Sequence, residues 1–264
     1  MGSGTIQVEG GHLYYEESGA GGALVLLHEG ILDSRMFDPQ FEAFAARYRT
    51  VRYDIRGYGR SSRPEGPYSD ADDLGALLDE LGIDRAGLVA LSMGGAIAIE
   101  FTLTHPSRVA ALVLGASGVR GFDTSAELDA LYAPAEAAFE AGDIRRAAEI
   151  ELSIWARKPT DPVVDERIHE IAMDNAHQVA LDGSLRIRME PPAIERLGEI
   201  AAPTLVLVGD EDVPDMLRIA ELLATSIPGA RSAVLGGADH VLNMRRPEEF
   251  NRLTLEFLSE TLLS

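Results

Sequence analysis

The sequence of 264 residues contains no cysteine. The chain therefore has no disulfide bridge, no thiolate nucleophile and no thiolate-bound metal. Its histidines and carboxylates are nowhere grouped at the spacing of metal ligands, so we predict no metal site. The glycine-rich stretch GYGRSS lacks the third glycine and the acidic residue of a dinucleotide-binding motif. We therefore expect no bound cofactor.

Positive charge is scarce as well. The chain has 23 Lys and Arg against 43 Asp and Glu, which gives a formal net charge of −20. This charge opposes binding to nucleic acid or to anionic membranes, and we expect neither partner. No apolar run reaches the roughly 18 to 20 residues of a membrane span, and the first residues, MGSGTIQVEGG, lack the basic start and apolar core of a signal peptide. A cytoplasmic location is the expectation that follows.

Short apolar runs alternate along the chain with amphipathic stretches. Helices are expected over residues 36–48 and 70–81, and over a third stretch that ends before Pro106. Consecutive strand–helix units indicate an α/β protein with a mostly parallel sheet covered by helices on both faces. The expected strands are TIQVEG and HLYYEES, which would form a hairpin, followed by ALVLLHEG, YRTVRYD, AGLVALS and VAALVLGAS.

The alternation stops after residue 117. From there to residue 198 the sequence has helical segments rich in Ala and Glu but no candidate strand. TLVLVGDED and RSAVLGGADH then resume the strand pattern, and residues 247–263 form a last amphipathic helix. We interpret residues 1–117 and 199–264 as one α/β core, and residues 118–198 as a helical cap inserted into it.

The stretch VALSMGGAIA, residues 89–98, places a serine between a predicted strand and a predicted helix. Ligands of open α/β sheets bind at the carboxyl ends of the strands, where Ser92 is expected. A sharp turn there requires small residues two positions before and after the serine, and these are Ala90 and Gly94. Ser92 is thus a candidate nucleophile, with a plain helix N-cap as the alternative.

A serine nucleophile needs a base and a group that orients the base. Of the six histidines, His240 lies at the end of the last predicted strand. Asp212 follows the strand TLVLVG, and one helix and one strand fit between it and His240. Asp210 follows the same strand and is the alternative acid. These side chains are expected to converge at the edge that carries Ser92.

The order nucleophile, acid, histidine resembles that of the α/β-hydrolase fold family. The resemblance implies a triad of Ser92, Asp212 and His240, and the family's spacing favours Asp212 over Asp210. It also implies that the backbone N–H groups of Gly30 and Met93 form the oxyanion hole. Beside the serine turn, the matching segments are HEGILDSRMFDPQ, YDIRGYGRSS, VGDEDVP and GGADHVLNMRRPEEFNRLTLEFL.

Two positions depart from the family pattern. Ala90 stands where the serine motif usually begins with glycine, which the sterics of a small residue allow. Glu29 stands where the oxyanion segment usually has glycine after His28. A carboxylate aimed into the hole would oppose the oxyanion, so we expect Glu29 to point away and to be hydrogen-bonded. Positioning of water or of a substrate hydroxyl is the alternative, and His28 is expected to stabilise the loop.

Large side chains of the cap are candidates for a substrate pocket above Ser92, although their helical spacing is also typical of core packing. These candidates are Phe122, Tyr132, Phe139, Trp155, Met173 and Met189. The arginines of the cap are expected to be solvated, although one of them could bind a substrate carboxylate. They are Arg145, Arg146, Arg157, Arg186 and Arg188.

These patterns predict a serine hydrolase that cleaves small to medium carboxylic esters or lactones through an acyl-enzyme, with the substrate and water as its partners. The resemblance is strongest to small capped esterases and 3-oxoadipate enol-lactonases. Hydrolases of carbon–carbon bonds and cofactor-free haloperoxidases or perhydrolases share the triad and stay open as alternatives. A small-molecule receptor on the same scaffold is the non-enzymatic alternative. Nothing in the sequence predicts the oligomeric state.

Overall fold

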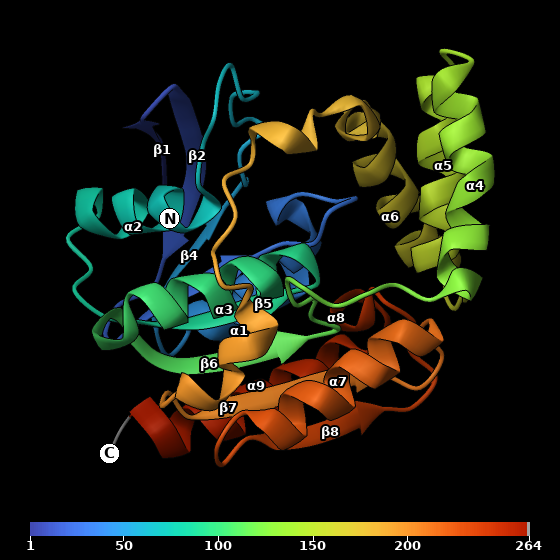
Figure 1. The fold of residues 1–264 in the computed structure, drawn as a ribbon. Coiled ribbons are helices and arrows are strands. Elements are labelled where there is room, and N and C mark those ends of the chain that lie inside the picture. Colours follow the sequence, from blue (N-terminus) through green and yellow to red (C-terminus); the bar gives the residue numbers. More distant parts are fainter. Residues whose placement is uncertain (263–264) are drawn as a thin grey trace.

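The computed structural model describes residues 1–262, and its strands form one sheet in the order β1-β2-β4-β3-β5-β6-β7-β8 (Figure 1). β1 pairs with β2, and β2 with β4, in the antiparallel sense, and all other neighbours are parallel. The carboxyl ends of the parallel strands therefore share one edge. The strands are β1 (Gly2–Val8), β2 (Gly11–Ser18), β3 (Ala23–Leu27), β4 (Arg49–Tyr53), β5 (Ala86–Leu91), β6 (Val109–Gly115), β7 (Thr204–Gly209) and β8 (Arg231–Leu235).

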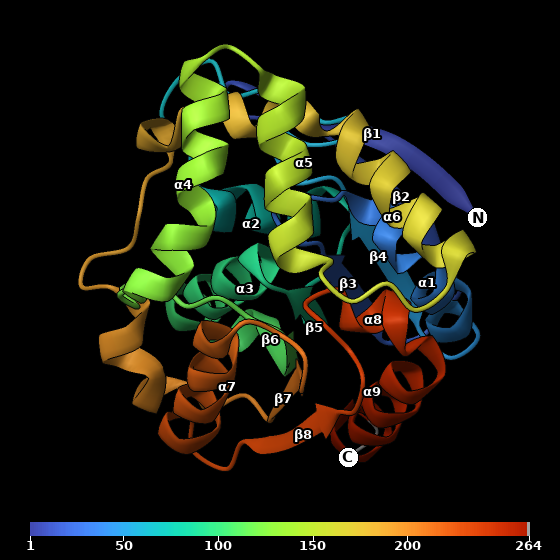
Figure 2. The ribbon, with the colours of Figure 1, turned by 90° about the vertical axis from the view of Figure 1, so that its right-hand side faces the viewer.

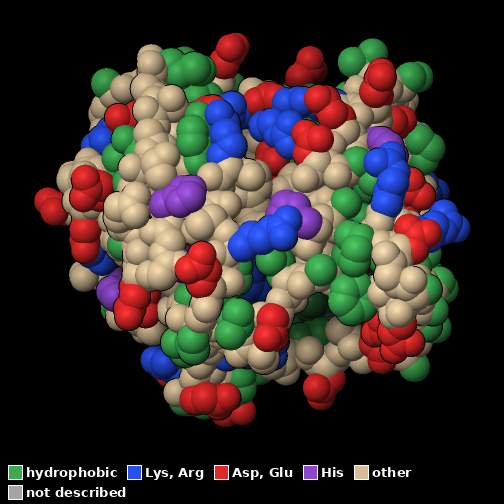
Figure 3. Space-filling view, turned by 90° about the horizontal axis from the view of Figure 1, so that it is seen from above, with side chains coloured by type: hydrophobic (Ala, Val, Ile, Leu, Met, Phe, Trp, Pro, Cys, Tyr) green, Lys and Arg blue, Asp and Glu red, His purple; other side chains and the backbone are tan. Residues whose placement is uncertain are grey.

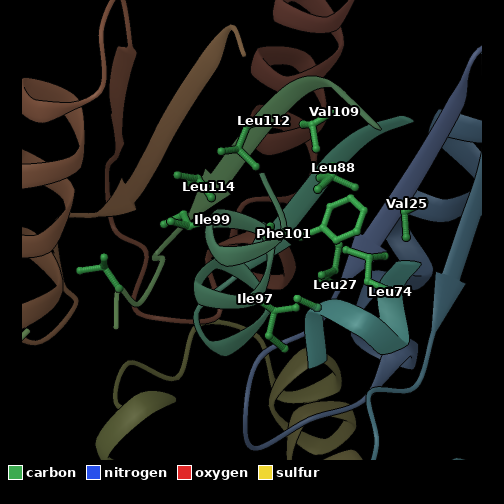
Figure 4. Close-up of a cluster of buried hydrophobic side chains, with 14 of the residues drawn as sticks. Val25, Leu27, Leu74, Leu88, Ile97, Ile99, Phe101, Val109, Leu112 and Leu114 are labelled. Carbon is green, nitrogen blue, oxygen red and sulfur yellow. The ribbon is translucent and has the colours of Figure 1, made fainter. Parts of the chain in front are cut away.

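The central strands are apolar on both sides because both faces of the sheet are covered. β5 and β7 are buried at every position. Along β5, Leu88 belongs to one apolar cluster, whereas Val89 on the opposite side belongs to a second cluster. Figure 4 shows the first cluster, in which Ile97 and Phe101 of a helix pack near Leu88 and Leu27. This two-sided burial is typical of parallel sheets.

Helices cover both faces of the sheet. The first cluster includes residues of α2 (Asp70–Glu80), α3 (Met93–Thr104) and α7 (Pro214–Ser226). The second cluster includes residues of α1 (Asp38–Ala45), α8 (Leu242–Arg245) and α9 (Pro247–Leu262). The arrangement confirms the predicted fold class. Among residues 1–262, no helix combines the length and the apolar character that crossing a bilayer requires.

Three helices lie between β6 and β7, namely α4 (Ala126–Glu140), α5 (Ile144–Trp155) and α6 (Pro162–Asp174). Each begins at a side-chain N-cap, formed by Ser125, Asp143 and Asp161, respectively. Figures 1 and 2 show these helices beyond the carboxyl ends of the strands. Short 3-10 turns complete the connection: η3 (Ala176–Ala180), η4 (Gly183–Leu185) and η5 (Ala193–Glu199).

The last of these turns, η5, returns the chain to the sheet. Its residues Ala193 and Leu197 are buried in the first apolar cluster, together with α3. The division into a core and a cap of residues 118–198 stays a prediction. Seen from above, the molecule carries acidic, basic and apolar side chains intermixed on its surface (Figure 3).

Candidate active site

Ser92 occupies a strained turn between β5 and α3. Its φ is 48° and its ψ is −112°, a conformation that residues with a side chain rarely adopt. Backbone bonds hold it there: the N–H of Ser92 donates to the carbonyl of Gly115 (3.0 Å), and the N–H of Gly118 donates to the carbonyl of Ser92 (3.0 Å). The hydroxyl makes no N-cap hydrogen bond to α3. The N-cap alternative therefore does not explain this serine.

The turn requires glycine at position 94. The N–H of Gly94 donates to the carbonyl of His28 (3.1 Å), so helix α3 begins directly against the loop that follows β3. A Cβ at this position would lie 2.6 Å from the carbonyl carbon of Leu27 and 2.7 Å from the carbonyl oxygen of His28. Ala90, by contrast, is fully buried in the first cluster, where its methyl group fits.

His240 follows β8 and is paired with Asp212, which follows β7. Nδ1 of His240 lies 2.9 Å from Oδ2 of Asp212, and both side chains are buried. The other oxygen of Asp212 accepts the N–H of Val213 (2.8 Å). Asp210 instead accepts the N–H of Gly237 (2.6 Å), in the turn that precedes the histidine. The carboxylate thus binds the Nδ1 side of the ring, and Nε2 has no hydrogen-bond partner within residues 1–262.

Ser92 and His240 line the same cavity, whose volume is about 510 Å³. Within residues 1–262 no hydrogen bond joins the hydroxyl of Ser92 to the imidazole. Catalytic hydrogen bonds are often long in the absence of substrate and shorten when it binds. The cavity is therefore lined by both a hydroxyl and a carboxylate-bound imidazole, which follow β5 and β8.

Gly30 and Met93 lie close together beside the same cavity. A Cβ at Gly30 would lie 3.8 Å from Cβ of Met93, and both residues line the cavity. Within residues 1–262 neither N–H group has a hydrogen-bond partner. Free N–H groups near a serine are suited to stabilising an oxyanion, so Gly30 and Met93 stay the candidates for this role.

His28 fixes the loop that carries Gly30. Its Nε2 accepts the N–H of Ile55 (2.9 Å), so its Nδ1 is the donor to the carbonyl of Glu29 (2.7 Å). The ring is fully buried, and this burial lowers the pKa of His28. A neutral imidazole with both nitrogens bound to the backbone has a structural role.

The expectation for Glu29 is wrong. Its side chain is 1% exposed, lines the cavity, and has no hydrogen-bond partner for either oxygen within residues 1–262. Oε2 lies 4.0 Å from Nε2 of His240. The neighbouring ring of His28 cannot donate to it because both of its nitrogens already bind the backbone. The carboxylate therefore faces the reactive edge of the imidazole.

Comparisons with known proteins agree with this geometry. Residues 24–253 match the alpha/beta hydrolase family. The chain belongs to this family. The match confirms the resemblance drawn from the serine turn and the four other segments, and it establishes the protein as an α/β hydrolase.

Several relatives of this α/β hydrolase cover nearly its whole length. RutD of Azorhizobium caulinodans, whose name describes a carbamate hydrolase, is 31% identical over 94% of this chain and 95% of its own. The 2-hydroxy-6-oxononadienedioate/2-hydroxy-6-oxononatrienedioate hydrolase of Burkholderia vietnamiensis is 32% identical over 93% and 90%. The crystal structure of the enol-lactonase from Burkholderia xenovorans LB400 superposes with a TM-score of 0.79 at 26% identity, covering 97% of this chain and all of that one.

Burial and neighbouring charges tune the two ionisable groups of the hydrolase that face each other. Burial raises the pKa of Glu29 to about 7, and the nearby imidazole of His240 opposes this shift. Burial lowers the pKa of His240, but the negative charges of Asp212, Glu29 and Asp239 outweigh it, so the net shift is upward. Because each group shifts the pKa of the other, the protonation of Glu29 and that of His240 are linked.

Three of the predicted pocket residues line the cavity of the hydrolase: Phe122, Tyr132 and Trp155. The ring centroid of Trp155 lies 4.3 Å from that of His240, and its Nε1 donates to the hydroxyl of Tyr132 (2.9 Å). The indole therefore covers the imidazole from the side of α5.

Phe139, Met173 and Met189 do not line this cavity, so the predictions for them are wrong. Phe139 is 43% exposed, and it lies two turns, or ~10 Å, farther along α4 than Tyr132. Met173 packs instead on the second apolar cluster, and Met189 packs on the first.

Charged residues that were not predicted from the sequence also line the cavity. Arg120 and Glu151 do so, from the loop after β6 and from α5. Arg186, which was expected to be solvated, forms an ion pair with the buried Asp70 (2.7 Å), and Arg120 lies 3.8 Å from the same carboxylate. The position of Arg120 just after a strand of the parallel sheet is the signal that could have identified it.

Asp239, the neighbour of His240, is fully buried. It connects the loop of His240 to the stretch between α5 and α6 and to helix α8. Its carboxylate accepts the backbone N–H of Lys158 (2.9 Å) and lies 3.2 Å from Nε of Arg245. Arg245 also pairs with Asp165 of α6. The loop that carries His240 is thereby fastened to the stretch between α5 and α6.

Proposed function

We propose that this α/β hydrolase cleaves small to medium carboxylic esters or lactones through an acyl-enzyme on Ser92. The observation that carries the proposal is the buried Asp212–His240 pair, whose free Nε2 opens on a cavity also lined by a serine in a strained turn. A cavity of about 510 Å³ lies within the range of small-molecule sites. The likeness to an enol-lactonase supports a lactone or ester as the substrate.

In the proposed reaction, Nε2 of His240 takes the proton of Ser92 as Oγ attacks the carbonyl carbon. The N–H groups of Gly30 and Met93 stabilise the oxyanion, each by roughly 3 kcal/mol. His240 then gives its proton to the leaving group. Asp212 holds the ring and stabilises its cationic form. Water finally releases the acid and regenerates the serine hydroxyl, so the reaction needs no cofactor.

We further propose that residues 118–198 act as a lid that limits the access of water and shapes specificity. Tyr132 of α4 and Trp155 of α5 supply the cavity wall that faces the sheet. The substrate and water are the expected partners of the enzyme, and a cytoplasmic location stays our expectation.

Cleavage of a carbon–carbon bond beside a carbonyl is the second candidate function. The relative from Burkholderia vietnamiensis, named for hydrolysis of an oxononadienedioate, favours it. The cavity also contains Arg120, a cation suited to a substrate carboxylate. A lactone or ester that is turned over faster than a vinylogous 1,5-diketone would favour the first candidate, and the reverse order would favour the second.

A fluorophosphonate probe followed by peptide mapping tests the nucleophile without knowledge of the substrate. We expect a single label on Ser92 and none in the Ser92→Ala variant. Label on another residue would contradict the proposal. Turnover of a panel of p-nitrophenyl esters and lactones, compared with Ser92→Ala, then tests the activity. A compound that raises Tm without any turnover would favour the receptor alternative.

A further inference from the structure

Glu29 takes no part in the acyl-transfer steps described above, and its surroundings leave it without a partner. It is 1% exposed, and within residues 1–262 neither of its carboxylate oxygens is hydrogen-bonded. Buried polar groups in folded proteins nearly always have a partner in the protein or in ordered water. An unpaired carboxylate aimed into a cavity therefore indicates a ligand or water that supplies the missing donor.

The position of Glu29 limits what that donor can be. Its Oε2 lies 4.0 Å from Nε2 of His240, the nitrogen left free because Nδ1 binds Asp212. A water oxygen placed ~2.8 Å from both atoms would have them at an angle of roughly 90°, near the ~105° between the two O–H bonds of water. One water molecule can therefore donate one proton to the ring and the other to the carboxylate.

We propose that Glu29 positions the hydrolytic water that releases the acyl group from Ser92, an inference that rests on the proposed function. The water oxygen attacks the acyl carbonyl carbon while one of its protons passes to Nε2 of His240. The second proton stays on that oxygen, hydrogen-bonded to Glu29. The tetrahedral intermediate then breaks its bond to Oγ of Ser92, and His240 returns the proton to Oγ. The products are the free carboxylic acid and the serine hydroxyl.

This arrangement discriminates between water and alcohols as acyl acceptors. An alcohol has a single O–H proton, which must go to His240 for the oxygen to attack. Its carbon substituent would then occupy the place of the second water proton, against a buried carboxylate that gains no hydrogen bond from it. Glu29 therefore favours hydrolysis over transfer of the acyl group to an alcohol.

Ionisation of Glu29 makes the preference for water over an alcohol as acyl acceptor dependent on pH. Burial raises the pKa of Glu29 to about 7; the imidazole of His240 opposes this shift, and Asp239 and Asp212 add to it. The carboxylate that accepts the water proton is thus populated above this value. The preference for water should weaken below it. The other titratable side chains that line the cavity are Tyr58, Arg120, Tyr132, Glu151 and Asp215.

The test measures how the acyl-enzyme partitions between water and methanol. Wild type and variants are incubated at pH 8 with phenyl acetate and a fixed concentration of methanol, and acetate and methyl acetate are quantified by NMR. In Glu29→Gly, the ratio of methyl acetate to acetate should rise roughly tenfold, as expected for loss of one hydrogen bond to a charged group. It should rise less in Glu29→Gln, which keeps an acceptor oxygen. Glu151→Gln removes a carboxylate elsewhere in the cavity and should leave the ratio unchanged.

An unchanged ratio in Glu29→Gly, with turnover still dependent on Ser92, would overturn the role of Glu29 and leave the proposed function standing. A wild type that turns over no ester beyond the level of Ser92→Ala would remove the proposed function and this inference with it. Circular dichroism shows whether Glu29→Gly folds. If it does not, Glu29→Gln and the pH dependence of the wild-type ratio decide. A ratio constant from about pH 5 to pH 9 and equal in the two proteins overturns the inference.

Discussion

Replacing Glu29 by glutamine should move the acid limb of the pH–rate profile to lower pH. Hydrolysis requires the neutral ring of His240 as the base. Burial lowers the pKa of His240, but the charges of Asp212, Glu29 and Asp239 together raise it above its ordinary value. The glutamine variant removes one of these charges and keeps the shape of the side chain. The pKa of His240 then falls, so the ring stays neutral at lower pH.

The distance between the two groups sets the size of the shift. Oε2 of Glu29 lies 4.0 Å from Nε2 of His240. Two unit charges this far apart interact by about 4 kcal/mol at an effective dielectric constant near 20, which corresponds to roughly 3 pH units. Burial raises the pKa of Glu29 to about 7, so the carboxylate carries only part of a full negative charge near neutral pH. The pair titrates together, and we expect an observed shift of about 1 to 2 pH units.

The assay is kcat/KM for one ester from about pH 4 to pH 10, in wild type and in Glu29→Gln. Asp210→Asn is the matched control, because Asp210 also follows β7 but accepts the N–H of Gly237 (2.6 Å) in place of the ring. Its acid limb should coincide with that of the wild type. An acid limb of Glu29→Gln that stays in place or moves to higher pH would refute the reasoning.

Three further predictions concern the triad, the serine turn and stability. Asp212→Asn should lower kcat/KM by roughly 10³- to 10⁴-fold with little change in Tm, because the amide no longer orients the ring of His240; a loss below tenfold would contradict that role. Gly94→Ala should lower the free energy of unfolding by about 3 kcal/mol, because its Cβ would lie 2.6 Å from the carbonyl carbon of Leu27. Urea denaturation measures this change, and a stability equal to wild type would disprove the close approach. The folded-state pKa of Glu29, about 7, exceeds its ordinary 4.5, so its stabilising contribution is complete below pH 4.5 and is lost as pH rises through 7. Relative to wild type, Glu29→Gln should therefore gain up to about 3 kcal/mol between pH 4 and pH 9, and equal Tm differences at both values would argue against a buried carboxylate.

The positions of the candidate catalytic residues could be predicted because each lies in the loop or turn that follows a strand of the parallel sheet. Periodic apolar runs define the strands, and parallel pairing brings the ends of β5, β7 and β8 to one edge. Ser92, Asp212 and His240 therefore share that edge whatever the detailed packing. The small residues around the serine turn were predictable for the same local reason, as the approach of Gly94 to Leu27 illustrates.

Side-chain orientation was not predictable, because it depends on partners far away in the sequence. Within the described part of the chain Glu29 has no hydrogen-bond partner, and the nearby ring of His28 cannot supply one because both of its nitrogens bind the backbone. Arg186 is half-buried rather than solvated because Asp70, more than a hundred residues earlier, forms an ion pair with it. Helical periodicity places Phe139 on the same side of α4 as Tyr132. Phe139 nevertheless lies outside the cavity, because α4 extends past the end of the cavity.

The three-way junction at Asp239 has a consequence for engineering. A segment grafted from a relative in place of residues 118–198 would replace both Lys158, whose N–H binds Asp239, and Asp165, which pairs with Arg245. The donor of Lys158 is a backbone N–H, so a graft whose backbone takes another path, or that has proline at this position, would remove a hydrogen bond from the anion next to the candidate base. A chimera that keeps these contacts must preserve the backbone path at position 158 and an acidic residue at position 165, or exchange Asp239 and Arg245 together with the graft.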